Sequence, residues 1–365
     1  MKILLINNDK GWGGGQEYLK DLALELGKSG VDVHFVVRAG SPSEERFKAV
    51  GMTVYPMPHH GVKELVALVN LAGIMRRERF HVISINREHD ILMTVLARRL
   101  AFPFSPPGRL LMSYHIGIAR RQPFLGSMDA ILCVSEHVRS RLLEFHPEVA
   151  PKTRILYHGI GLPAPPPEEK YAVNRSRRLF HGVGFPLIGM VGAFWKNQAE
   201  LVDCIPLLQR RFPTLKVAFV GDNMELPLVT PLMEKIRAMG VEESVIFTGK
   251  IPRERVGDAF HDFDLSVTTH RNEGFGIVHI ESLAAGTPVV CYNEGGQVDL
   301  FRGEDVALLV DGGVPEFSAA VAGLLGDDER RFAMGKRGRD LVERRYSLRA
   351  MGERYLRFYR EIVGQ

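Results

Sequence analysis

One stretch of the chain, residues 264–296, limits its fold more than any other. An apolar, β-branched run at 265–269 predicts a buried strand, and a glycine-rich loop follows it. Apolar residues then recur at helical spacing over 277–286, where a glycine and the nearby Pro288 predict the end of a helix. A second apolar run at 289–292 predicts the next strand. Strand, loop, helix and strand form the crossover unit of a parallel, doubly wound sheet.

The loop in this stretch suits an anion. Gly274 and Gly276 flank the predicted start of the helix, where backbone N–H groups have no partner inside the helix and the dipole is positive. Glu273 and Glu281 are separated by roughly 12 Å along a helix axis. One carboxylate can stand beside a phosphate while the other accepts hydrogen bonds from sugar hydroxyls. The pattern favours a nucleotide with hydroxylated rings on both sides of its phosphates, although two such glutamates are more often a solvated helix face.

Composition places the chain among ordinary globular proteins. Its 365 residues, 45% hydrophobic and 25% charged, allow two domains. No apolar run approaches the ~18 residues of a membrane span, and the N-terminus lacks a signal peptide's cleavage pattern, so we expect a cytoplasmic protein. Cys133, Cys204 and Cys291 are far apart in apolar surroundings. We expect them to be buried free thiols.

Charge is unevenly distributed along the chain. Residues 1–165 hold 21 Lys and Arg against 15 Asp and Glu, whereas residues 166–365 hold 26 against 28. Arginine clusters lie at 76–79, 98–99 and 120–121. Each cluster alone is more often a solvated helix end, but a functional interpretation is contact with an anionic acceptor or with the acidic inner face of a membrane. No nucleic-acid-binding motif accompanies the charge, so we expect no nucleic-acid partner.

The N-terminal part has the same plan of strand, loop, helix and strand. An apolar strand at 2–7 leads through a loop with Gly13, Gly14 and Gly15 into a helix that we expect from Gln16. The loop is not a complete dinucleotide fingerprint, because Gln16 stands where the third glycine belongs. The loop either approaches a phosphate or sugar, or is a turn without a ligand.

These motifs together resemble those of a known family. Glu273-Gly-Phe-Gly with Glu281, followed by Gly286-Thr-Pro and Gly295-Gly296, is similar to the signature of the retaining GT-B glycosyltransferases whose two glutamates are separated by seven residues, the glycosyl transferases group 1. The resemblance implies that the first glutamate and the following amides contact the donor sugar and phosphate, and that the second holds the ribose. The donor-binding residues it implies are Gly13, Gly14, Gly15, Lys196, Lys250, Ile251, Glu273, Gly274, Phe275, Gly276, Ile277 and Glu281.

The resemblance also implies catalytic roles for His115, Glu273 and Lys196. His115 directly follows a predicted strand, at the sheet edge where ligands of such folds bind, and it matches the family's histidine that contacts the donor sugar. Arg87 and His89 follow another predicted strand and are candidates to bind the acceptor, although ordinary polar side chains on a solvated surface would explain them equally well. His158 stands where the family more often has asparagine.

One departure from the family pattern concerns the diphosphate. Lys196 fits the family's lysine that faces it, but Ala193 stands where the family has an arginine. This substitution leaves less positive charge for a leaving group. Arg271 and Lys250 are candidates to replace the arginine.

We therefore expect an α/β chain with the GT-B fold, in which two Rossmann-like parallel-sheet domains face a cleft. Residues 1–165 form the acceptor side, 166–345 the donor side, and 346–365 a helix that crosses back to the first domain. The expected function is retaining transfer of a sugar from a UDP- or GDP-sugar to a hydroxyl of a cell-envelope or lipid-linked glycan, without cofactor or metal. The alternatives are a non-catalytic nucleotide-sugar sensor or partner subunit and, third, an NADP-dependent oxidoreductase.

Overall fold

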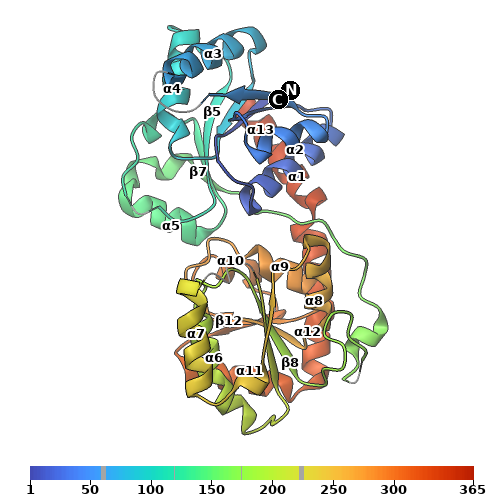
Figure 1. Ribbon diagram of the computed structural model, residues 1–365. Coiled ribbons are helices and arrows are strands. Elements are labelled where there is room, and N and C mark those ends of the chain that lie inside the picture. Colours follow the sequence, from blue (N-terminus) through green and yellow to red (C-terminus); the bar gives the residue numbers. More distant parts are fainter. Residues whose placement is uncertain (59–62, 119, 174, 222–225) are drawn as a thin grey trace. The chain divides into compact units, whose positions relative to one another are not determined.

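The chain divides into two compact units, which are drawn in Figure 1. The computed structural model describes residues 1–58, 63–118, 120–173, 175–221 and 226–365. Unit 1 comprises Met1–Gly159 and Leu348–Gln365, and unit 2 comprises Ile160–Ser347. The boundaries expected from the sequence lie a few residues away from these.

Unit 1 is built on a parallel sheet that has seven strands in the described ranges, in the order β3-β2-β1-β4-β5-β6-β7. Its strands are β1 (Lys2–Asn7), β2 (Asp32–Arg38), β3 (Thr53–Met57), β4 (Val82–Ile85), β5 (Arg109–Tyr114), β6 (Ala130–Cys133) and β7 (Thr153–Ile155). Its helices are α1 (Gly14–Lys28), α2 (Pro42–Ala49), α3 (Lys63–Glu78), α4 (Asp90–Ala101), α5 (Glu136–Phe145) and α13 (Leu348–Val363). Buried parallel strands such as β4, which is buried at every position, are expected where helices cover both faces.

The last helix of the chain belongs to this first unit. α13 lies beside α1 (Figure 1), and its residues Met351, Tyr355 and Phe358 share one apolar core with Leu19 and Leu22 of α1. These α13 residues recur at helical spacing, so one stripe of the helix is buried. An amphipathic stripe therefore fixes the C-terminal helix to the N-terminal unit.

Unit 2 is built on a second parallel sheet, with six strands among the residues that the structure describes, in the order β10-β9-β8-β11-β12-β13. Its strands are β8 (Leu187–Val191), β9 (Lys216–Val220), β10 (Val245–Gly249), β11 (Leu265–Thr268), β12 (Val289–Tyr292) and β13 (Ala307–Val310). Its helices are α6 (Gln198–Gln209), α7 (Leu226–Ala238), α8 (Val256–Asp262), α9 (Ile277–Ala284), α10 (Gln297–Phe301), α11 (Val314–Leu325) and α12 (Asp328–Leu341).

Alternate residues of these strands point into two separate cores. Val217 and Phe219 of β9 pack into a core shared with α6, α7 and α11. Ala218 and Val220 of the same strand pack into a second core with Phe260 of α8. Unit 2 is thus a sheet between two helical layers, as the crossover pattern of the sequence predicts.

The stretch that most constrains the fold has the predicted structure. β11 and β12 are neighbouring parallel strands joined through α9, and Gly286, with φ +74°, follows the helix. Cys133, Cys204 and Cys291 are free and buried, which confirms that expectation. In the described ranges, no helix combines the length and the apolar character needed to cross a bilayer.

Candidate active site

Two loops meet at the carboxyl edge of the sheet in unit 2. One loop joins β8 to α6, the other joins β11 to α9, and β8 and β11 are neighbours in the sheet. Thr269 Oγ1 donates to the carbonyl of Asn197 at 2.7 Å, and Asn197 Nδ2 donates back to the carbonyl of Thr269 at 3.3 Å. These reciprocal bonds hold the two loops together where ligands of such sheets bind.

Lys196 and Glu273, one from each loop, form an ion pair. Lys196 Nζ lies 2.7 Å from Glu273 Oε2, and the two side chains are only 14% and 18% exposed. Burial raises the pKa of Glu273, but the charge of Lys196 and its hydrogen bond outweigh burial, so the net pKa is lowered. An ionised carboxylate and an ammonium group with three donors thus stand side by side.

The start of α9 depends on glycine. Gly276, the N-cap of α9, has φ +94°, and a Cβ there would lie 2.5 Å from His279 Cδ2. Phe275 is buried, with its ring centroid 6.1 Å from that of Tyr346, so its side chain anchors the loop. The amide of Gly296 donates to the carbonyl of Glu273 at 2.7 Å. The backbone of the loop is therefore fixed, and Ile277 is the first residue of α9, where the positive end of the helix dipole lies.

The structure distinguishes the two candidates to replace the family's arginine at Ala193. Arg271 contacts Glu294 at 2.5 Å and Glu200 at 3.1 Å, and its guanidinium lies 3.5 Å from the ring centroid of Tyr292. Its charge is therefore already engaged by two carboxylates. Lys250 is exposed, directly after β10.

Glu281 lies on α9 beside a pocket of about 260 Å³. Its side chain is 12% exposed and forms an ion pair with Arg253, a residue that the sequence analysis missed. Burial raises the pKa of Glu281, and the charge of Arg253 only partly offsets this. Half-buried Ile251 precedes Arg253 in the same loop. The pocket is lined by Ile160, Gly161, Leu162, Pro163, Arg253, Glu254, Val256, Gly257 and Glu281.

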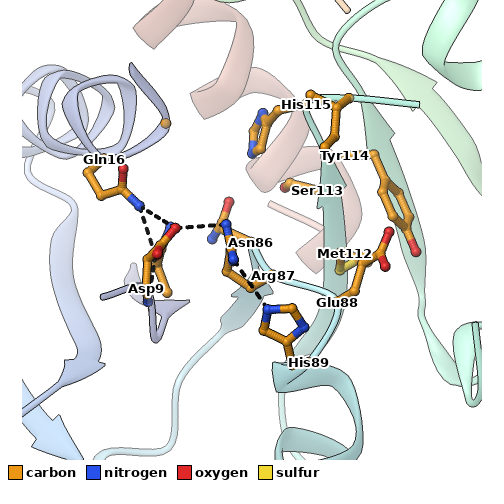
Figure 2. Close-up of a pocket in the computed structure, with 13 residues that line it drawn as sticks. Asp9, Gln16, Asn86, Arg87, Glu88, His89, Met112, Ser113, Tyr114 and His115 are labelled. Carbon is orange, nitrogen blue, oxygen red and sulfur yellow. Dashed lines mark hydrogen bonds and ion pairs between the residues drawn. The ribbon is translucent and has the colours of Figure 1, made fainter. Parts of the chain in front are cut away.

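A second group of predicted residues lines a pocket of about 370 Å³ in unit 1 (Figure 2). His115, Arg87, His89 and Gly15 all line it, whereas Gly13 and Gly14 do not. They come from the carboxyl ends of β5, β4 and β1, which are close together in the sheet. The other lining residues are Asn7, Asp9, Gln16, Asn86, Glu88, Met112, Ser113, Tyr114 and Ile116.

Charged groups in this pocket are linked in a chain that Figure 2 shows. Arg87 Nη1 lies 2.7 Å from Asp9 Oδ2, and Arg87 Nη2 lies 3.2 Å from His89 Nε2. Gln16 Nε2 also donates to Asp9 at 3.2 Å. Asp9 therefore orients the arginine, a role that its place in the glycine-rich loop did not reveal.

The expected helix start at Gln16 is wrong by two residues, because α1 begins at Gly14. Gln16 Oε1 accepts a hydrogen bond from the amide of Gly13 at 2.9 Å. The amides of Gln16 and Glu17 donate in turn to the carbonyl of Gly13, so Gly14 and Gly15 belong to the first turn of the helix.

His115 is paired with a second histidine. Its Nδ1 lies 3.2 Å from His158 Nε2, and the ring of Tyr18 lies 3.9 Å from that of His158. Burial lowers the pKa of His115 to about 4, so the ring is neutral at physiological pH. His115 Nε2 is buried without a hydrogen-bond partner in the described part of the chain. The sequence analysis noted that His158 departs from the family's asparagine, but it did not predict this pair.

Sequence reasoning overlooked one Asp-x-Asp pair, Asp262 and Asp264, a spacing that can hold a divalent ion. Asp264 is 0% exposed and contacts Arg175 at 2.8 Å and Arg177 at 2.9 Å. Asp262 accepts hydrogen bonds from the backbone amides of 178–180. Both carboxylates therefore hold the segment 175–180 against the rest of unit 2.

Comparison with known proteins covers both units. A family model described as glycosyl transferases group 1 matches residues 176–341, and one described as glycosyltransferase family 4 matches residues 12–162. A D-inositol 3-phosphate glycosyltransferase of Corynebacterium glutamicum is 26% identical over 91% of this chain and 87% of its own length.

Two further matches differ in what they cover. A GDP-mannose-dependent alpha-(1-6)-phosphatidylinositol monomannoside mannosyltransferase of Mycolicibacterium smegmatis is 33% identical over 44% of this chain, and the match spans only 43% of that relative's length. The crystal structure of Anabaena HepE in complex with UDP-glucose matches with a TM-score of 0.77 at 18% identity, over 99% of this chain and 100% of that chain. Since family models match both units and the GT-B fold matches throughout, the chain belongs to the glycosyl transferases group 1 family.

Proposed function

We propose that the chain is a retaining glycosyltransferase that moves a sugar from a nucleotide-diphosphate sugar to a hydroxyl group without a metal ion. The observation that carries the proposal is the Lys196–Glu273 ion pair beside the glycine-rich start of α9. A diphosphate needs positive charge and a sugar needs hydrogen-bond acceptors, and the pair offers both. The relatives support a nucleotide-sugar donor, since one is named as GDP-mannose-dependent and another was crystallised with UDP-glucose.

The proposed donor contacts follow from the chemistry of each group. The amides from Gly274 to Ile277 and the ammonium of Lys196 bind the diphosphate, because a helix start favours anions. Lys196 has three N–H donors, so it can keep Glu273 while it binds phosphate. Glu281 accepts hydrogen bonds from the ribose, in the pocket that Arg253 shares. The turn with Lys250 and Ile251 lies against the base.

The proposed reaction places the growing negative charge on the diphosphate as its bond to the anomeric carbon breaks. Lys196 and the start of α9 stabilise that charge, and fixed dipoles need no rearrangement to do so. Ionised Glu273 accepts a hydrogen bond from the sugar and holds it in position. The acceptor hydroxyl attacks from the face that the diphosphate leaves, and a phosphate oxygen takes its proton.

The proposed acceptor is a cell-envelope or lipid-linked glycan at the inner face of a membrane. Neutral His115 presents Nε2 to the transferred sugar, while Arg87 and His89 contact the acceptor. The acceptors in the names of the two relatives, a phosphatidylinositol monomannoside and D-inositol 3-phosphate, both include a phosphate, which supports an arginine in this role.

An assay of nucleotide release tests the proposal. The purified chain is incubated with UDP-glucose or GDP-mannose and a pool of glycolipid acceptors, and free UDP or GDP is measured. We expect release that depends on both an acceptor and Lys196.

A second candidate, a nucleotide-sugar sensor, is favoured by Ala193 alone, since it removes a cation from the diphosphate site. Calorimetry that finds binding, together with no release in any acceptor pool, would favour the sensor over the enzyme.

A further inference from the structure

Exposed apolar side chains are concentrated on two helices of unit 1. α3 and α4 pack against each other (Figure 1). Twelve large apolar side chains are exposed among the described residues, and Phe104, just after α4, is the most exposed of them at 99%. Six others lie on these two helices: Leu65, Val66, Val69, Leu92, Leu96 and Leu100. Scattered apolar residues are ordinary on a surface, but a concentration of them marks an interaction site.

Both helices are apolar on two sides. On α4, Ile91 and Val95 are buried, while Leu92, Leu96 and Leu100 recur once per turn on the exposed side. On α3, Leu65 and Val69 have the same spacing on the exposed side. Because packing within unit 1 accounts for only one of the two sides, the outer side is expected to meet an apolar phase. This outer surface of α3 and α4, together with Phe104, is called the outer apolar surface below.

The charges next to the outer apolar surface are basic. Exposed Arg76 and Arg99 lie in the last turns of α3 and α4. The two carboxylates whose side chains are described on these helices are held inward: Asp90 is buried and accepts a hydrogen bond from Asn8, and Glu78 pairs with Lys2 at 2.9 Å. Among the side chains described on these two helices, none that is exposed is a carboxylate.

We propose that the outer apolar surface docks on a lipid bilayer that contains anionic lipids. Its leucines and Phe104 enter the boundary between head groups and acyl chains, while Arg76 and Arg99 contact the lipid phosphates. A second copy of the chain is a poorer occupant, because a two-fold interface would bring the same arginines toward each other. This inference does not depend on the proposed sugar transfer.

Vesicle flotation tests the charge part of the proposal. The full chain is mixed with vesicles of phosphatidylcholine alone or with added phosphatidylglycerol, in the absence of any sugar donor. We expect flotation with the acidic vesicles that salt weakens, and roughly twenty-five-fold weaker binding for the double variant Arg76→Gln/Arg99→Gln, since each arginine contributes about fivefold. The matched control Arg210→Gln/Arg237→Gln removes two exposed arginines of unit 2 and should bind like the wild type.

Phe104 tests the apolar part. A Phe104→Ser variant should bind acidic vesicles several-fold more weakly and keep its unfolding temperature, because the side chain is 99% exposed. Equal flotation of the double arginine variant and its control, or no flotation of the wild type, overturns the proposal. If sedimentation shows that the chain is a dimer and that Phe104→Ser dissociates it, the proposal is also overturned. The outer apolar surface is then an interface between two copies of the chain. Because no donor is present, a failure of sugar transfer would not affect these results.

Discussion

The two glycine loops of the molecule differ in why they contain glycine. In unit 2, Gly276 and Gly295 have φ of +94° and +76°, and a Cβ on either would lie 2.5 Å from a neighbouring atom. In unit 1, Gly14 and Gly15 have no atom within 4 Å of the Cβ position. The backbone of unit 2 thus requires its glycines, whereas nothing within unit 1 requires those of the first loop. Open space at Gly15, which lines the pocket of unit 1, agrees with the expectation that this loop approaches a ligand.

The same contrast holds for charge. Lys196 and Glu273 in unit 2 balance each other inside the protein. In unit 1, neutral His115 keeps a buried nitrogen without a hydrogen-bond partner in the described ranges. A buried polar atom of this kind costs about 1–3 kcal/mol, which a sugar hydroxyl would relieve. The two charges of the unit 2 site are therefore paired within the protein, whereas the unit 1 pocket keeps a nitrogen that a ligand could pair.

The largest effect is expected from Lys196→Ala. The variant removes the cation nearest Glu273 and leaves that carboxylate buried without its partner. We expect kcat to fall by about 100-fold to 1,000-fold, the usual cost of losing one donor to a developing oxyanion. Nucleotide release at saturating donor measures it. Lys235→Ala is the matched control, since it breaks another lysine–carboxylate pair of unit 2, 2.6 Å long, to Asp203 on the neighbouring helix α6. Similar rates for both variants would contradict the role of Lys196.

The second prediction concerns the loss of stability of the folded chain as the pH is lowered. Unfolded histidine binds a proton near pH 6.5, but burial lowers the pKa of folded His115 to about 4. Between these values the unfolded state holds more protons, so stability is full above about pH 6.5 and falls as the pH drops toward about 4, by roughly 3 kcal/mol. Urea unfolding at several pH values measures this slope.

The two tryptophans allow the slope to be assigned to one unit. Trp12 lies in unit 1 and Trp195 in unit 2, so a Trp195→Phe background reports unit 1 alone. In that background His115→Asn should make the pH dependence shallower, and the slope that remains belongs to His158, whose pKa burial lowers as well. Parallel slopes in the two proteins would contradict a buried, neutral His115.

Sequence reasoning predicted the structure of residues 264–296 well, because glycine and proline mark the end of the helix in this stretch. The strands around α9 and its stop at Gly286 follow from such local signals. It failed where distant side chains decide the structure. Arg253 meets Glu281, and His158 meets His115, across many residues of chain, and no local pattern encodes these pairs. The roles assigned to the donor and acceptor residues remain predictions.

The third prediction sets the two glycine loops against each other. Gly276→Ala should destabilise unit 2 by about 1–3 kcal/mol, because of its positive φ and the contact with His279. Gly14→Ala should stabilise unit 1 by about 0.5–1 kcal/mol, because alanine suits a helical turn with free space. Urea unfolding with Trp195 and Trp12 as the respective reporters measures both. If Gly14→Ala also lowers turnover, a ligand uses the open space beside this residue. Unchanged turnover would contradict the view that the first loop contains glycine at this position in order to admit a ligand.

The smallest effect is expected from Glu281→Gln. The amide keeps the size of the side chain but loses the charge that pairs with Arg253 and the second acceptor oxygen for a ribose hydroxyl. We expect UDP to bind about tenfold more weakly, near 1.4 kcal/mol, with little change in kcat once donor is saturating. Calorimetry with UDP measures the affinity, and Glu254→Gln, in the same pocket, is the matched control. Because burial raises the pKa of Glu281, wild-type affinity should also fall toward that of the variant as the pH is lowered through the carboxylate's titration. Equal affinity of wild type and Glu281→Gln for UDP at neutral pH would contradict the assignment of the ribose to this pocket. Glu281 would then be only the ion-pair partner of Arg253.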